Sequence, residues 1–324
     1  LAAMGIAWKP FRSFLAVSSA LALFSIALYQ GELARAEQVF FLKYLISSQT
    51  AIMWMSALFF IATGAYCLGL AARSDFADAT GSALTWCAVT MGTTGLMVRW
   101  YESYLIGTDV GHIPLSNLYE VFVLFALMTG LLYLYYEGRY ATRRMGAFVL
   151  LVISAAVAFL LWYTFSREAQ EIQPLIPALQ SYWMKVHVPA NFIGYGAFAL
   201  AAMVGVADLL VRKGILANRL PPAEVLDDVM YKAIAIGFAF FTIATILGAL
   251  WAAEAWGTYW QWDPKETWAF IVWLNYATWL HIRLTKGLRG PMLAWWAIAG
   301  LVVTAFAFVG VNMFLSGLHS YGSL

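Results

Sequence analysis

Long apolar segments dominate this chain of 324 residues and restrict it to one class of fold. Hydrophobic residues make up 63% of the sequence and charged residues only 11%, whereas soluble domains carry roughly 45–50% and about 25%. A helix needs about 20 mainly apolar residues to cross a bilayer core of ~30 Å. Nine segments meet that requirement, approximately residues 11–29, 50–72, 81–98, 117–136, 145–165, 188–211, 231–252, 267–284 and 292–314. The sequence therefore predicts an all-α, polytopic membrane protein with about nine transmembrane helices.

The basic residues are divided unevenly between the two sets of helix ends. Thirteen of the 19 lysines and arginines fall at one set of ends, which includes Lys9, Arg73 and Arg139, and six fall at the other. Because basic residues are enriched on the cytoplasmic side, this asymmetry predicts a cytoplasmic N-terminus and, after nine crossings, an external C-terminus. The net charge of +2 follows from the same asymmetry and indicates no nucleic-acid partner.

A tryptophan-rich stretch follows the seventh apolar segment. The 29 residues from Trp251 to Trp279 hold seven of the 15 tryptophans and are centred on WGTYWQWDPKETW. Five aromatic residues lie in or beside the loop, namely Trp256, Tyr259, Trp260, Trp262 and Trp268. Tryptophan has a large flat apolar surface and one polar N–H group. Crowded around a short loop on the predicted outer face, these rings predict a binding surface for a large, flat, partly charged ligand.

The chain has only four histidines, and their positions differ. His112, His187 and His319 lie on the predicted outer side, and His187 and His319 flank the tryptophan-rich loop. Imidazole is the commonest protein ligand of heme iron, and two imidazoles bind it from opposite faces, so His187 and His319 form a candidate axial pair. His281 lies within the eighth segment, where an ionisable residue is a functional candidate. No other histidine lies at its depth, so a second ligand there would be a non-histidine or come from another chain.

Charged residues near the loop suggest further roles. Four cations are candidates to pair with the carboxylates of a metalloporphyrin, namely Lys265, Arg99, Arg167 and Lys185. Asp263 and Glu266 cannot pair with carboxylates directly. They are expected to orient a histidine N–H group, to hold Lys265, or to cap the helix that begins at Pro264. They are also candidate general acids or bases, by proximity alone.

Four ordered motifs resemble one family. The stretch WAAEAWGTYWQWDPKETWAFIVWLNYATWLHIR resembles the "WWD" signature of the CcsA (ResC) proteins of c-type cytochrome biogenesis, within the heme-handling group that includes CcmC and CcmF. GHIPLSNLYE, SYWMKVHVPANFIGYGAF and GLHSYG are also similar to CcsA segments. The ending DPKETW favours CcsA over CcmC and CcmF. The resemblance divides the chain into membrane helices of uncertain role at 1–80 and a CcsA-like heme-handling domain at 81–324, with its WWD loop at about 251–268.

The resemblance implies a function. Such a protein exports heme and, with a CcsB (ResB) partner, presents heme b for thioether attachment to the C-x-x-C-H motif of apocytochrome c on the outer membrane face. It would be a subunit of a cytochrome c heme lyase, active only with the partner chain. It would lie in the cytoplasmic (inner) membrane or the thylakoid membrane, with the periplasmic or lumenal face active. Membrane lipid and possible thiol-reducing proteins complete the expected partners.

The resemblance also implies roles for single residues. His187 and His319 would hold the iron of the external heme, while His281 would hold an inner heme with a second ligand from the partner. The heme-binding surface would comprise Trp256, Tyr259, Trp260, Trp262, Asp263 and Trp268. His112 lies in a family-typical motif but receives no role.

Three other functions remain open on the sequence. A heme carrier without ligase activity would not need His281. An electron-transfer b-type cytochrome would pair histidines on neighbouring helices within the membrane, and this chain offers none. A heme-free transporter would use its tryptophans for packing only.

Overall fold

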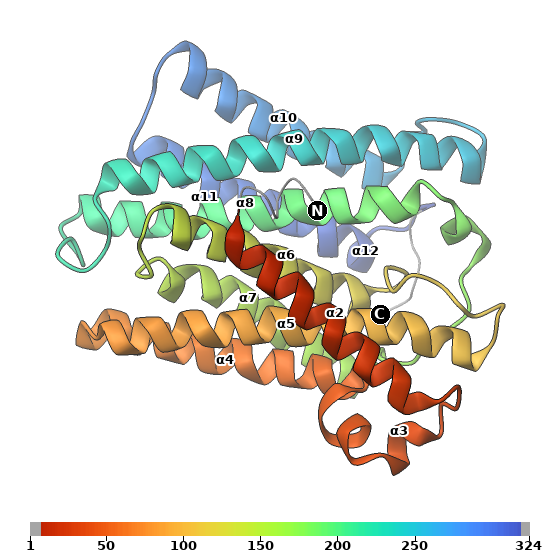
Figure 1. Ribbon diagram of the computed structural model, residues 1–324. Coiled ribbons are helices and arrows are strands. Elements are labelled where there is room, and N and C mark those ends of the chain that lie inside the picture. Colours follow the sequence, from red (N-terminus) through yellow and green to blue (C-terminus); the bar gives the residue numbers. More distant parts are fainter. Residues whose placement is uncertain (1–7, 319–324) are drawn as a thin grey trace.

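The computed structural model describes residues 8–318, and this range contains helices but no β-strand (Figure 1). The long helices are α2 (Lys9–Tyr29), α4 (Ser48–Ala72), α5 (Asp75–Ile106), α6 (Leu118–Arg139), α7 (Gly146–Arg167), α8 (Met184–Arg212), α9 (Ala223–Trp256), α10 (Pro264–Thr285) and α11 (Pro291–Ala305). The short elements are α3 (Arg35–Gln38), η1 (Leu42–Ile46), η2 (Pro177–Gln180), η3 (Phe306–Gly310) and α12 (Val311–Phe314). The all-α prediction is confirmed.

All nine predicted apolar segments lie within helices, the last one running through α11, η3 and α12. Within residues 8–318, seven helices are long and apolar enough to cross a membrane. The other two are α5 and α10, which carry more charged and polar side chains, such as Arg99 and Glu102 on α5. Several membrane-spanning helices are therefore present, while the count of nine crossings and the orientation of the termini stay predictions.

Two helices occupy the centre of the bundle. Of the apolar 18-residue stretch that could cross a membrane, 78% is buried inside the protein in α8 and 72% in α6. The corresponding share is only 28% in both α2 and α9. α8 packs against α6, α9 and α11, and α4 packs along α5 as a second antiparallel pair (Figure 1). Helices at the edge of the bundle therefore expose apolar surface to their surroundings, as expected of a protein that lies in lipid.

Small residues on α8 permit its close packing. A Cβ atom on Gly196 would lie 2.8 Å from the Thr129 hydroxyl oxygen of α6, and one on Gly194 would lie 3.2 Å from the Gly237 carbonyl oxygen of α9. Both distances are tighter than ordinary contact. Small residues that let backbones approach are the usual means of helix association in membranes. A larger side chain at either position would separate α8 from its neighbour.

Two buried ion pairs join helices of the bundle. Arg99 of α5 donates to Glu120 of α6 at 2.7 Å, with the two side chains 4% and 1% exposed. Arg283 of α10 pairs with Asp227 of α9, and both are buried. Since an unpaired buried charge is costly, each pair commits its two helices to one relative position.

Cys67 of α4 and Cys87 of α5 are both exposed, so they are not part of the buried core, and neither forms a disulfide.

We expect Arg99→Met to destabilise the protein by about 3–5 kcal/mol, because it leaves the Glu120 carboxylate buried without its cation. The matched control is Lys232→Met, which removes an ion pair with Asp228. In that pair the side chain of Lys232 is 48% exposed and that of Asp228 is 41% exposed. Pairs this exposed contribute about 0–1 kcal/mol. Thermal unfolding in mild detergent, followed by tryptophan fluorescence, measures both variants; equal melting temperatures would contradict the assignment of Arg99 as a clamp between α5 and α6.

Candidate functional site

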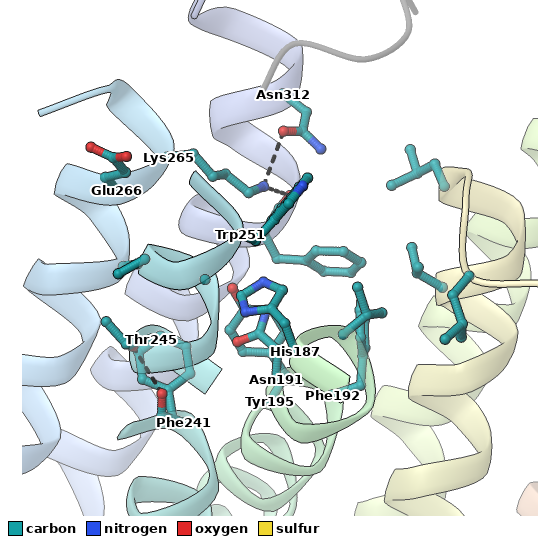
Figure 2. Close-up of a pocket in the computed structure, with 18 of the residues that line it drawn as sticks. His187, Asn191, Phe192, Tyr195, Phe241, Thr245, Trp251, Lys265, Glu266 and Asn312 are labelled. Carbon is teal, nitrogen blue, oxygen red and sulfur yellow. Dashed lines mark hydrogen bonds between the residues drawn. The ribbon is translucent and has the colours of Figure 1, made fainter. Parts of the chain in front are cut away.

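A cavity with an empty volume of about 1330 Å³, its open mouth included, lies where α6, α8 and α10 begin and α9 ends. Its wall also includes the loop 257–263, η3 and α12. Figure 2 shows His187 within it, with Lys265 and Asn312 to one side. Most of the lining is apolar or aromatic, and the polar side chains are few: Ser116, Asn117, His187, Asn191, Thr245, Lys265, Glu266 and Asn312. Such a lining is typical of a site for a small molecule with a large apolar surface.

His187 is held in one orientation by α9. Its Nδ1 lies 2.7 Å from the Ala244 carbonyl oxygen, an acceptor, so Nδ1 carries the proton and donates. The lone pair is therefore on Nε2, the nitrogen that an iron would need. Histidines that bind metals usually donate their other ring N–H to a carbonyl or carboxylate in this way. The imidazole of His187 has the tautomer and the support of an axial ligand.

Gly248 provides the space for this ring. A Cβ atom on Gly248 would lie 2.9 Å from Cε1 of His187 and 3.1 Å from Nδ1. The indole of Trp251 packs on the same imidazole, with ring centroids 5.7 Å apart. Two successive turns of α9 thus provide the hydrogen-bond acceptor, the space and an aromatic wall for His187.

The predicted aromatic surface separates into two parts. Tyr259 and Trp260 line the cavity, and the indole nitrogen of Trp260 is buried with no hydrogen-bond partner among residues 8–318. Trp262 is 67% exposed and meets Trp260 edge-on at 5.8 Å between ring centroids. Trp256 packs on Trp251 at 5.5 Å, and Trp268 packs on a neighbouring phenylalanine of η3 at 4.3 Å. Trp256, Trp262 and Trp268 are not among the residues that line the cavity.

Asp263 and Glu266 form the loop and start α10. Asp263 is the N-cap residue and Glu266 completes a capping box with it. Glu266 Oε2 also accepts from the backbone N–H of Gln261 at 2.8 Å, so one carboxylate closes the turn. Both side chains are buried. The expected cap of the helix after Pro264 is confirmed, while a catalytic role for either carboxylate stays a prediction.

Lys265 is the cation that lines the cavity. Its Nζ donates to the Phe308 carbonyl oxygen at 2.9 Å and to Asn312 Oδ1 at 3.0 Å (Figure 2). Both acceptors are neutral, and no carboxylate of residues 8–318 forms an ion pair with Nζ. A carboxylate that entered the cavity would meet an ammonium group that no described carboxylate contacts within ion-pair distance, although the charge of Asp263 acts on it from further away.

The other three candidate cations are placed differently. The guanidinium of Arg99 is occupied by Glu120 and by the carbonyl oxygens of Gln170 and Glu171. Arg167 and Lys185 are exposed, and neither lines the cavity. Of the four cations, only Lys265 is therefore brought to the cavity.

Both ring nitrogens of His112 have hydrogen-bond partners in the loop before α6. His112 is buried, its Nδ1 lies 2.6 Å from the Val110 carbonyl oxygen and its Nε2 lies 3.0 Å from the Ser116 hydroxyl. Ser116 in turn donates to Glu120, the partner of Arg99. This chain of hydrogen bonds shapes the loop that leads into α6, whose N-cap is Asn117.

Of the remaining two histidines, only His281 lies among the described residues, and it does not line the cavity. His281 is exposed on α10 near the end away from the cavity, and its ring forms no hydrogen bond with residues 8–318. His319 lies outside the described residues. The preceding residue, Leu318, donates its backbone N–H to Asp263 Oδ1 at 2.6 Å, so the described chain ends at the loop.

Several cavity residues escaped sequence reasoning. Asn191 follows His187 by one helical turn, which the spacing could have shown. Gly248, Thr245 and Asn312 carried no such signal, because they reach the cavity only through the packing of α9 and α12.

Among residues 8–318, no group of three His, Cys, Asp or Glu side chains is placed to hold a metal ion. An iron already held in a macrocycle needs only axial ligands from the protein.

Comparisons with known proteins agree on one family. Residues 115–319 match the family described as cytochrome c assembly protein, a range that contains the whole cavity lining. The chain is 40% identical over 232 residues to the cytochrome c biogenesis protein CcsA of Chlamydomonas reinhardtii, covering 70% of this chain and 64% of that protein. It is 35% identical over 294 residues to CcsA of Chlorella vulgaris, covering 79% and 90%. This chain thus spans less than two thirds of the Chlamydomonas protein and most of the Chlorella protein.

A solved structure shares the fold. The cytochrome c heme lyase CcmF superposes with a TM-score of 0.63 over 82% of this chain and 49% of its own, at 18% sequence identity. The family match and the CcsA relatives agree with the resemblance of the WWD stretch. The chain belongs to the cytochrome c assembly protein family and is a multi-pass membrane protein of cytochrome c maturation.

Proposed function

We propose that this chain is the heme-binding and heme-exporting subunit of a cytochrome c synthase that acts with a CcsB (ResB) partner. One observation carries the proposal. His187 extends into a largely apolar cavity with its Nδ1 proton committed to the Ala244 carbonyl oxygen, which is how an axial ligand of heme is oriented.

The cavity suits heme b in three respects. Aromatic rings such as Trp260 offer flat surfaces to the macrocycle. Lys265 offers a buried ammonium group to one propionate. Most of the remaining lining is apolar, which suits the apolar body of the porphyrin. In this proposal, His319 is the second axial ligand of the external heme.

His281 belongs to a separate, inner heme site in this proposal. Its exposed position on α10, near the end away from the cavity, leaves it accessible to a helix of the partner chain. α10 carries further exposed apolar side chains, including Phe270, Ile271 and Leu274. A partner helix that covers this face would supply the second axial ligand.

The lyase reaction joins a cysteine thiol to each heme vinyl group. A C–S bond forms, the S–H bond and the vinyl π bond break, and the hydrogen passes to the other vinyl carbon, so the addition involves no net oxidation. The protein is required to hold the heme and present its vinyl edges, because the cofactor carries the reactive atoms. The histidine of the C-x-x-C-H motif then displaces one axial ligand. Asp263 and Glu266 are proposed to serve mainly by shaping the loop.

We propose that the cavity end of the bundle lies at the external face of the cytoplasmic or thylakoid membrane. The substrates are heme b and apocytochrome c, and thiol-reducing proteins would keep the apocytochrome cysteines available. The basic residues at the other helix ends support this orientation.

The first prediction is spectroscopic. Purified in mild detergent with its partner, the protein should show the reduced spectrum of a low-spin, bis-histidine b-type heme. His187→Gly and His319→Gly should each lose most of the external heme, and added imidazole should restore part of it by filling the vacated position. A colourless wild-type preparation would refute the proposal, and wild-type spectra in both variants would refute the axial pair.

A second prediction separates ligase from carrier. The complex should attach heme covalently to an apocytochrome in a cell without other maturation proteins, and His281→Gly should reduce that product. A complex that binds heme but yields no thioether product would identify a heme carrier instead.

A third prediction concerns the tryptophans. Trp260→Ala should weaken heme retention because it removes a wall of the cavity, and Trp262→Ala should have a smaller effect because its side chain is 67% exposed. Trp295→Ala is the matched control, since Trp295 is 58% exposed on α11 and does not line the cavity. Heme content per protein after detergent washing measures all three. Equal heme content in the Trp260 and Trp295 variants would indicate that Trp260 only packs.

The fourth prediction tests the propionate contact. Lys265→Met should weaken heme binding about tenfold, the usual range for a charge-assisted hydrogen bond. Heme dimethyl ester, which lacks the carboxylate charges, should bind the wild type and Lys265→Met equally. A loss of the same size for both porphyrins would show that Lys265 supports the fold rather than the ligand.

A further inference from the structure

Asp263 uses its two carboxylate oxygens for two different segments. Oδ2 accepts from the backbone N–H of Lys265 at 2.9 Å, within the cap of α10. Oδ1 accepts from the backbone N–H of Leu318 at 2.6 Å, a residue 55 positions further along the chain. The cap needs one oxygen only, so the second oxygen has a separate effect, which is to bind the segment that follows α12.

Gly317 fits this segment against the carboxylate. A Cβ atom on Gly317 would lie 2.3 Å from Asp263 Oδ1 and 3.0 Å from Pro264 Cδ. Any side chain at position 317 would push the segment away from the first turn of α10. A hydrogen bond and a close backbone approach therefore hold the segment at the same point.

Asp263 is itself held firmly. Its side chain is 7% exposed, and its backbone N–H donates to Glu266 Oε2 at 3.2 Å. The loop that carries Trp260 and the segment that ends at Leu318 are therefore joined through one buried carboxylate. A displacement of the loop would displace the segment with it.

The geometry points to Asp263 as the positioning residue for the second heme ligand. His319 follows Leu318 directly in the sequence, so the proposed ligand is joined to the segment that Asp263 holds. In this inference Asp263 acts by holding the segment that leads to His319, and it is not itself a ligand of the iron. This inference rests on the proposed function, in which His319 binds the iron.

Two variants release the segment by different means. Asp263→Ser keeps a residue that is as good an N-cap as aspartate, but its single oxygen cannot serve both the cap and Leu318. Gly317→Ala leaves Asp263 and the cap unchanged and separates the segment sterically. Gly64→Ala is the matched control, because a Cβ atom on Gly64 of α4 meets nothing within 4 Å.

The experiment measures heme retention and the reduced spectrum of each full-length variant, purified with its partner, with and without imidazole. Asp263→Ser and Gly317→Ala should retain heme about tenfold less well, in the range of a charge-assisted hydrogen bond. Imidazole should restore both, as for His319→Gly, because only an axial ligand is missing. It should not restore Trp260→Ala, in which a wall of the cavity is missing. Gly64→Ala should match the wild type.

Two outcomes would overturn the inference while the proposed function stands. In the first, wild type and His319→Gly behave as expected, but Asp263→Ser and Gly317→Ala keep wild-type heme. In the second, both variants lose heme and imidazole restores neither, which would assign Asp263 to the shape of the cavity. A wild type without heme would instead refute the proposed function itself.

Discussion

The close packing of α8 against α9 determines the geometry of the whole cavity. Gly194 and Gly237 let the two backbones approach, and that approach brings the imidazole of His187 onto Gly248 and the Ala244 carbonyl oxygen. The same contact sets the tautomer of His187, because a carbonyl oxygen accepts only from a protonated nitrogen. In a membrane protein, where the hydrophobic effect does not bring helices together, such contacts decide helix positions.

Two buried ion pairs hold helices of this bundle together. Arg99 with Glu120, and Arg283 with Asp227, each join two helices, and each pair carries no net charge. Lys265 differs, since its two acceptors are a backbone carbonyl and an amide. The difference has a physical consequence for ligands: an anionic group gains more at Lys265 than at any of the paired cations.

The tryptophan-rich loop combines a structural and a ligand-binding part. Its carboxylates, Asp263 and Glu266, are engaged in the cap and the turn, and they hold Trp260 toward the cavity. Both acids are buried and accept hydrogen bonds from the backbone of this loop and of α10, so they hold its conformation. The density of charged residues in the loop therefore reflects the need to maintain a turn at the end of a membrane helix.

The sequence by itself determined the fold class, the approximate positions of the helices, the family and the choice of His187, Trp260 and Lys265 as residues of interest. These depend on the length and periodicity of apolar segments and on local motifs, both of which are readable along the chain. Only the tertiary structure decided that Arg99 is occupied elsewhere, that Trp262 and Trp268 do not line the cavity, and that Asp263 binds Leu318. Those outcomes depend on which helix faces meet, and a contact between residues 55 positions apart leaves no local pattern in the sequence.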